Sequence, residues 1–492
     1  MTWHEYHECT KHSVESLRRA RRVLDWANMP DPFRHYEGTP VLDLPAEPLT
    51  PEIASLDVLH GKIGATVAAD GPTFLSQLLF YSAAISASKR VPSTGYRYAL
   101  RVNPSSGNLH PTEFHFATRG LKGWPDGLYH YRPSSHMAEQ RARGDFMASL
   151  TGDDAPLVFV LTSIAWREAW KYGERAYRYC LHDMGHAWQA LVLAARAIGC
   201  ESFASAHFPD DEITRLCRLN EDEWPMLMVA LRGSSIPSGD AHPPDVSWSE
   251  GYANRLSNES IDYAMIDSMH AATKLCTDCG AIREAEPAAA GRGEIVLPRP
   301  ASATRGFGDV ARTRRSALGF QGGRLSMSLA HLSAILDAAA QPFSADFSRA
   351  RFVQLHLYVH RVDGLEPGVY RHWPESGELE KMQSGNQRVA AAGLSLGQDL
   401  AGDCCVAFSM IADIDRAVRS HGDRGYRYVH FEAGALGQRL YLAAEALGLR
   451  ATGIGAFFDD AVHRYLNLAP DQGQVIYHFA IGHPVPDPRL DA

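Results

Sequence analysis

The sequence contains two copies of one block, and this duplication limits what the chain can fold into. Residues 173–179 align without a gap with residues 422–428 (422 − 173 = 249), and in the same register Gly185 matches Gly434. A shorter block repeats at a spacing of 241. Copies of roughly 200 residues are far too long for a solenoid repeat. They indicate two related domains that pack on each other as an internal pseudo-dimer.

Composition sets the broad class of protein. With 492 residues, the chain is long enough for two or three domains that each bury a core. Its hydrophobic fraction of 45% and charged fraction of 21% are typical of globular proteins, and no apolar run reaches the ~18 residues of a membrane span. A net charge of −9 without a long basic run argues against a nucleic-acid partner. The N-terminus lacks a signal-peptide pattern and eight cysteines do not make a disulfide scaffold, so a cytoplasmic location is expected.

Periodicity predicts the fold class. Each copy has the order helix, strand, strand, long helix and strand, which is typical of an α+β fold. The two long helices, predicted at 182–198 and 431–447, are apolar on nearly every side and rich in Ala. Because such helices are buried, we expect both at the centre of the molecule.

Segments of different composition flank the two copies. We expect a Pro-rich leader that lies across the first domain, then a first domain, a linker and a second domain, over residues 1–70, 71–240, 241–300 and 301–492. The linker contains Cys276 and Cys279, a spacing that could begin a zinc site. No second pair with suitable spacing follows, so we interpret this segment as an exposed turn and expect no metal.

The most specific short motif lies in the first copy, just before a predicted strand. A turn of Pro, hydroxyl, Gly and amide residues offers backbone N–H groups and short polar side chains to a planar polar ligand. The same composition is also that of an ordinary loop. The second copy has lost the motif. The candidate binding residues are Pro104, Ser105, Ser106, Gly107, Asn108 and His110.

A basic motif opens the second copy. Arg314, Arg315 and Ser316 would suit a phosphate group, because guanidinium groups bind phosphate oxygens bidentately. The alternative is a basic, solvated end of the linker. The first copy has no comparable run of arginines.

A Lys-Tyr pair precedes the duplicated block in the first copy only. Lys171 and Tyr172 are replaced by Ser420 and His421 in the second copy. Such a pair can transfer protons, provided that burial and charged neighbours shift the pKa values. To act as a base, either group would need a lowered pKa. The alternative is a packed Tyr beside a solvated Lys.

Together these motifs resemble the flavin-dependent nitroreductase superfamily, and within it the SagB-type (ThcOx) dehydrogenases. The resemblance covers both halves, about 70–240 and 300–490, and implies two nitroreductase-like domains with FMN as cofactor. It implies that the motif from Pro104 to His110 contacts FMN from the neighbouring domain, and that Arg314, Arg315 and Ser316 bind its phosphate.

The resemblance also assigns the residues around the flavin ring. It implies that a loop after the second long helix reaches the isoalloxazine, and that the Lys-Tyr pair handles protons. The loop residues are Ile454, Gly455 and Ala456, and the catalytic pair is Lys171 and Tyr172.

The two copies retain complementary parts of this site. In nitroreductases FMN lies at a dimer interface, and here the phosphate motif and Gly loop survive in the second copy while the Pro-Ser and Lys-Tyr motifs survive in the first. We therefore predict one composite site and one FMN per chain. One departure is Leu318, where the superfamily usually has Lys or Arg; Arg312 and Arg324 are candidates to replace it.

The resemblance implies an FMN-dependent oxidoreductase that oxidises an azoline or a related peptide or natural-product intermediate, with hydride transfer to flavin N5. The alternatives are an NAD(P)H-dependent nitroreductase or quinone reductase, and a non-catalytic partner in a biosynthetic complex. Expected partners are a small-molecule or peptide substrate and other enzymes of a biosynthetic pathway, and the pseudo-dimer is free to dimerise further. Neither nucleic acid nor membrane is an expected partner.

Overall fold

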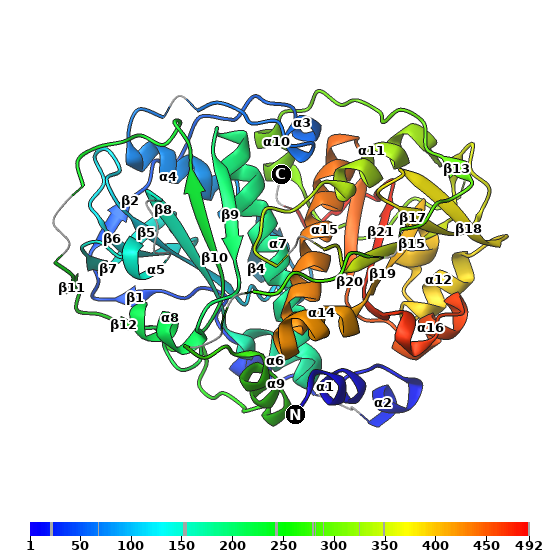
Figure 1. Cartoon of the computed structure of the whole chain (residues 1–492), viewed down its shortest axis with the longest axis horizontal. Helices are drawn as coiled ribbons and strands as arrows, with labels where there is room; N and C mark the ends of the chain where they lie inside the picture. The colour runs from blue at the N-terminus through cyan, green and yellow to red at the C-terminus, as the bar shows by residue number, and fades with distance from the viewer. Residues whose placement is uncertain are drawn as a thin grey trace.

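The computed structural model describes the chain except residues 20–22, 67, 151–154, 242–244, 278–279, 281, 289, 324, 348–349 and 491–492. Cys279 and Arg324 therefore lie outside the described residues. Two halves lie side by side, each with a sheet and a long helix, and the two long helices meet at the centre (Figure 1). Within the described ranges, no helix is long and apolar enough to cross a bilayer. The α+β prediction is confirmed.

Each half is built on one antiparallel sheet. In the first half the order is β11-β7-β6-β5-β8-β10-β9, with β2 also paired to β7. In the second half the order is β13-β18-β17-β15-β19-β21-β20. The first-half strands are β2 (Val41–Asp43), β5 (Thr112–Thr118), β6 (Gly127–Arg132), β7 (Met137–Arg143), β8 (Leu157–Ser163), β9 (Glu201–Ser205), β10 (Trp224–Arg232) and β11 (Ser247–Trp248). The second-half strands are β13 (Ile295–Val296), β15 (Val353–Val359), β17 (Gly368–Trp373), β18 (Glu378–Ser384), β19 (Val406–Ala412), β20 (Arg450–Ile454) and β21 (Gln474–Gly482).

Smaller elements complete the halves. The two-stranded pairs are β1 (Tyr36–Glu37) with β12 (Tyr252–Ala253), β3 (Ile85–Arg90) with β4 (Arg97–Arg101), and β14 (Met327–Ser328) with β16 (Val362–Asp363). The shorter helices are α1 (Trp3–Cys9), α2 (Val14–Arg19), α3 (Ser55–Leu59), α4 (Gly71–Phe80), α5 (Met147–Leu150), α6 (Ala165–Tyr172), α8 (Asp210–Leu216), α9 (Ala264–Thr273), α10 (Phe307–Thr313), α11 (Leu329–Ala340), α12 (Arg388–Leu394), α13 (Asp399–Asp403), α14 (Ile414–His421) and α16 (Asp459–Leu466).

The two central helices pack directly on each other. They are α7 (Ala176–Ala197) and α15 (Gly425–Ala446). The contact is closest at the matched pair Gly185 and Gly434: a Cβ on Gly434 would lie 2.1 Å from the carbonyl oxygen of His182, and one on Gly185 would lie 2.2 Å from that of Phe431. Only glycine allows this approach. The predicted central packing of the two copies is thus confirmed.

Both helices begin one to two turns earlier than predicted, so that Arg178 and Arg427 of the duplicated block lie in their first turns, while Arg175 and Arg424 come directly before them. Arg175 and Arg178 contact Asp459 of the second half, with N–O distances of 3.1 and 2.9 Å. Arg424 and Arg427 contact Asp210 of the first half at 2.6 and 2.7 Å. These groups are all buried. The duplicated block therefore conserves a symmetric pair of ion clusters that join the two halves.

The leader contacts both halves, so the expectation that it lies across the first domain is only partly met. The hydroxyl of Tyr6 donates to Glu174 O at 2.5 Å, and the ring of His7 hydrogen-bonds Tyr426 at 3.2 Å in the second half. Further along, β1 and β2 lie on the first half. The linker adds β11 to one sheet and β13 to the other. Both flanking segments thus fasten the two halves together.

Candidate functional site

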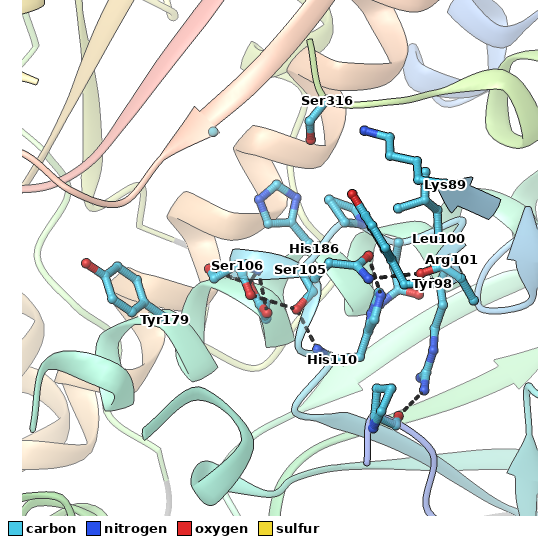
Figure 2. Close-up of a pocket in the computed structure, with 18 of the residues that line it drawn as sticks. Lys89, Tyr98, Leu100, Arg101, Ser105, Ser106, His110, Tyr179, His186 and Ser316 are labelled. Carbon is cyan, nitrogen blue, oxygen red and sulfur yellow. Dashed lines mark hydrogen bonds between the residues drawn. The ribbon is translucent and has the colours of Figure 1, made fainter. Parts of the chain in front are cut away.

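A cavity of about 770 Å³ lies between the two halves, and residues of both halves line it. One end carries Ser316 and Lys89, the other carries Tyr179, and the loop with Ser105 and Ser106 runs between them (Figure 2). The cavity brings together all the residues predicted to bind the cofactor. These are Pro104, Ser105, Ser106, Gly107, Asn108, His110, Arg314, Arg315, Ser316, Ile454, Gly455 and Ala456.

The Pro-Ser loop is held in place by its own side chains and by α7. The backbone N–H of Ser106 donates to both carboxylate oxygens of Asp183, at 3.1 and 3.0 Å, and its hydroxyl donates to Oδ1 at 3.0 Å. Ser105 Oγ accepts the N–H of His110 at 2.7 Å. Gly107, Asn108 and His110 all have positive φ (59°, 60° and 50°), which is uncommon for the last two. The loop is therefore a constrained structure and not an ordinary surface turn.

The arginine end joins the two halves. Arg314 donates from Nε to Val102 O at 3.0 Å and from Nη2 to Arg101 O at 3.3 Å, while its buried Nη1 has no hydrogen-bond partner among the described atoms. Arg315 donates to Ser86 O at 2.8 Å, and burial together with neighbouring arginines lowers its pKa to about 10. The Ser316 hydroxyl lies 2.8 Å from that of Tyr441. An anion at Arg314 Nη1 would give this buried group the partner it lacks.

The positions of Lys89 and Arg312 relative to the cavity differ from those expected from the sequence. Lys89, which sequence reasoning missed, lines the cavity and contacts Asp487 at 2.9 Å. Arg312 instead lies over the ring of Phe80, 3.8 Å from its centroid, and is not among the lining residues. Arg312 does not take the place that Leu318 leaves open.

The Gly loop closes the far end of the cavity. A Cβ on Gly453 would lie 2.0 Å from the Tyr477 hydroxyl, and one on Gly455 would lie 2.4 Å from the ring of Tyr179. The hydroxyl of Tyr179 donates to Gly455 O at 3.1 Å. The loop therefore needs glycine at both positions to lie against these two tyrosines.

Lys171 and Tyr172 end α6 beside the Pro-Ser loop. A Cβ on Gly107 would lie 2.7 Å from the Tyr172 hydroxyl and 3.0 Å from Lys171 Nζ, and Tyr172 lines the cavity. Burial, together with Glu168, Tyr179 and Asp183, raises the pKa of Tyr172 well above its usual value. This shift is opposite to the lowering that a base would need. Tyr172 therefore stays protonated at neutral pH and can donate a hydrogen bond.

The symmetry-related position between the halves is filled. The ring of Phe347 stacks on Tyr428 with centroids 4.6 Å apart, and Trp188 packs against Phe347 at 5.5 Å. The cavity found there is about 150 Å³, and residues of the linker line part of it, Ile282 among them. Large aromatic side chains thus occupy the space that the first position leaves open.

The described residues hold no cluster of three or more His, Cys, Asp or Glu side chains that could bind a metal. Cys276 is an exposed free thiol. Its companion Cys279 lies outside the described ranges.

Several lining residues were not predicted from the sequence. They include Asp183 and His186 on α7, Tyr441 on α15 and Tyr477 on β21. A signal was present for three of them, because at a spacing of 249 the counterparts of His186, Tyr441 and Tyr477 are Ala435, Val192 and Met228. Polar groups occur at these positions only on the side of the cavity.

Comparisons with known proteins agree with this picture. The model of the nitroreductase family matches the chain twice, over residues 97–234 and 311–483. A putative nitroreductase from Anabaena variabilis has a crystal structure with a TM-score of 0.77 and 27% identity, covering 98% of this chain and 99% of that one. A putative nitroreductase from Methanocaldococcus jannaschii is 33% identical over 119 residues, which is 24% of this chain and 59% of the relative's length. A weaker likeness, with a TM-score of 0.28 and 21% identity over 48% of this chain and 86% of that one, is to a chain of the Escherichia coli microcin synthetase McbBCD complex.

The chain belongs to the nitroreductase family and carries the family's domain twice. Members of this family are oxidoreductases, and they are usually flavin-dependent. The resemblance inferred from the motifs is thus confirmed at the level of the family.

Proposed function

We propose that the chain is an FMN-dependent oxidoreductase of the SagB/ThcOx type, with one FMN in the composite cavity. The observation that carries the proposal is that both halves supply different, complementary residues to one cavity. The symmetry-related position is filled by Phe347 and Trp188, so it lacks room for a second cofactor.

The residues present fit such a cofactor. Arg314 has a buried N–H group without a partner, which suits the phosphate, and Ser316 and Lys89 lie at the same end. The Pro-Ser loop would lie along the flavin, and the loop of Ile454, Gly455 and Ala456 would meet the ring system. When bound, FMN supplies two-electron redox chemistry. The chain's own residues bind and orient the reactants and move the proton.

Lys171 and Tyr172 favour the dehydrogenase type over a simple reductase. Oxidation of an azoline ring removes a proton as well as a hydride, so it needs a group that handles protons. Lys171 Nζ and the Tyr172 hydroxyl both lie next to Gly107, and of the two residues Tyr172 lines the cavity. An NAD(P)H-dependent nitroreductase or quinone reductase is the alternative, and a colourless, non-catalytic scaffold is the third possibility.

The first test is the flavin content of the purified protein. We expect one FMN per chain, because only one of the two related positions is open. Released flavin measured against protein concentration, with the visible spectrum, decides the ratio. Two flavins per chain would refute the composite site, and protein that takes up no FMN would support the scaffold role.

The phosphate end is tested by comparing FMN with riboflavin. Arg314→Ala should weaken FMN binding about tenfold or more, since a charge-assisted hydrogen bond is worth about 1.5–3 kcal/mol, and should affect riboflavin much less. Fluorescence titration measures both affinities. Arg312→Ala is the matched control, because Arg312 does not line the cavity. Equal weakening of both ligands would mean that Arg314 acts only through its bonds to Val102 and Arg101.

The role of the Pro-Ser loop is tested at Gly107. Gly107→Ala should displace Tyr172 and Lys171 and reduce turnover about tenfold or more, while FMN stays bound. Gly377→Ala is the control, since Gly377 has a similar positive φ (66° against 59°) but nothing within 4 Å of the added Cβ. Equal effects of the two substitutions would show that backbone strain, and not contact with the Lys-Tyr pair, is responsible.

A further inference from the structure

Two buried carboxyl groups lie behind the Lys-Tyr pair. Glu168 on α6 is fully buried and Asp183 on α7 is 3% exposed, and the two carboxyls are close enough for each to shift the pKa of the other. Glu168 Oε2 has no hydrogen-bond partner among the described atoms. Ser105 Oγ lies 3.5 Å from Glu168 Oε1, and Asp183 accepts three hydrogen bonds from Ser106. Asp183 lines the cavity. Both acids are therefore fixed between α6, α7 and the Pro-Ser loop.

The surroundings do not favour two negative charges at this place. From α6, Lys171 and Tyr172 face the pair, and from α7 it is faced by Tyr179 and Cys180. From the second half, Tyr477 on β21 faces it as well. Lys171 is the cation that acts on Glu168. Two carboxyls in contact cannot both ionise at neutral pH. Burial raises the pKa of Asp183 to about 7, and burial together with Asp183 raises that of Glu168 well above its usual value.

Comparison with the second copy distinguishes two roles for these acids, which are support of the backbone and service to the Lys-Tyr pair. At a spacing of 249, Asp183 becomes Glu432, which still accepts the backbone N–H groups of Phe352 and Val353, each at 3.0 Å. A carboxylate at this position of the long helix therefore accepts backbone N–H groups in both copies, in the second copy at the start of β15.

Glu168, in contrast, has no acidic counterpart in the second copy. Glu168 becomes Ala417, just as Lys171 and Tyr172 become Ser420 and His421. Positions 168, 171 and 172 lie on one face of a single helix, at i, i+3 and i+4. Glu168 is thus present only where the Lys-Tyr pair is present, which ties it to that pair and not to the support of the loop.

We infer that Glu168 and Asp183 share one proton and form a proton store that serves Lys171 and Tyr172. The inference rests on the proposed function and extends it. Lys171 or Tyr172 takes up the proton that the substrate loses and passes the proton that it already holds to the carboxyl pair. The charge of the pair then changes from −1 to zero. The two electrons leave the substrate with the hydride, for which a flavin is the acceptor. Glu168 is a positioning residue in this scheme, because it acts through its neighbours.

The first experiment needs neither flavin nor substrate. Because both pKa values are raised in the folded state, the folded protein binds more protons than the unfolded chain, and stability falls as pH rises from about 4.5 to above 7. Glu168→Gln leaves Asp183 as a single acid that accepts three hydrogen bonds, so part of this decline should disappear. An infrared band of a protonated carboxyl at about pH 8, where the pair holds one proton, should be lost in the same variant. An unchanged band and an unchanged pH dependence would overturn the inference, whether or not the chain binds FMN.

The second experiment uses the holoenzyme. The pair accepts a proton only when singly ionised, so we expect turnover of the wild-type enzyme to rise with pH through about 7. In Glu168→Gln this acidic limb should move to higher pH by about half a pH unit or more at unchanged flavin content, because the interaction with Glu168 lowers the pKa of Asp183. Glu432→Gln, which alters the symmetry-related carboxyl, should keep the wild-type profile. A wild-type profile in Glu168→Gln would overturn the inference while leaving the proposed function intact, whereas absence of flavin would count against the proposed function alone.

Discussion

Replacement of Lys171 by Ala or of Tyr172 by Phe is expected to lower turnover by about 10²–10⁴-fold, the range that general acid–base groups contribute. The flavin content and visible spectrum should stay unchanged, because both residues lie beside Gly107 and neither is a hydrogen-bond partner of Arg314 or Ser316. Tyr172→Phe removes only the hydroxyl that lies beside Gly107 and keeps the edge-to-face contact with Tyr179, whose ring centroid is 4.6 Å away. A loss of rate in this variant therefore reports on the proton and not on packing.

The measurement begins with a substrate screen. Thiazoline- and oxazoline-containing peptides are incubated with the enzyme under air, and flavin reduction is the readout. NADH and NADPH are tested anaerobically in the same assay. The symmetry-related variants Ser420→Ala and His421→Phe are the controls and should keep full activity. A simple reductase becomes the better assignment if the Lys171→Ala, Tyr172→Phe double variant has the turnover of the wild type. The same conclusion follows if NADH or NADPH reduces the flavin rapidly in both the wild type and the double variant.

The sequence predicted the architecture well because the duplication and the apolar helices are local signals. The two long helices were expected at 182–198 and 431–447, and they lie at Ala176–Ala197 and Gly425–Ala446. The long helices were placed too late, since Arg175, Arg178, Arg424 and Arg427 look like surface residues in a periodicity pattern. Their burial depends on Asp459 and Asp210 from the opposite half, which no local pattern reveals. The hairpin of β3 and β4 and the contacts of α1 with both halves were missed for the same reason.

The candidate site could be assembled from motifs only in part. The residues predicted to bind the cofactor could be named because the two copies differ at them, and one cavity brings these residues together. Glu168 and Asp183 were missed because they meet only through the turn at Gly173, where φ is 60° and α6 gives way to α7. The direction of the pKa shift of Tyr172 could not be predicted from the sequence either, because it depends on burial and on those two acids.

Breaking one of the buried ion clusters between the halves should have a large effect on stability. Asp459 is fully buried and accepts hydrogen bonds from Arg175, Arg178 and the backbone of His12, and the arginines lower its pKa below the usual 3.8. Asp459→Asn leaves two buried guanidinium groups without a counter-charge. We expect it to destabilise the protein by about 3–5 kcal/mol, the usual cost of breaking a buried ion pair, and to release the cofactor held between the halves.

Urea unfolding followed by both near-ultraviolet circular dichroism and flavin fluorescence measures this effect, because a two-domain chain need not unfold in one step. Asp460→Asn is the control, since that carboxylate is 59% exposed and pairs with Lys11 at 3.0 Å, which predicts a change of about 0–1 kcal/mol. A lowered folded pKa contributes stability that is complete above the unfolded pKa and is lost as pH falls through the folded one. The difference between wild type and Asp459→Asn should therefore be full at pH 7 and shrink below about pH 4. A difference at pH 7 no larger than that of Asp460→Asn would show that the halves are held together by the apolar contact of α7 with α15 and not by these charges.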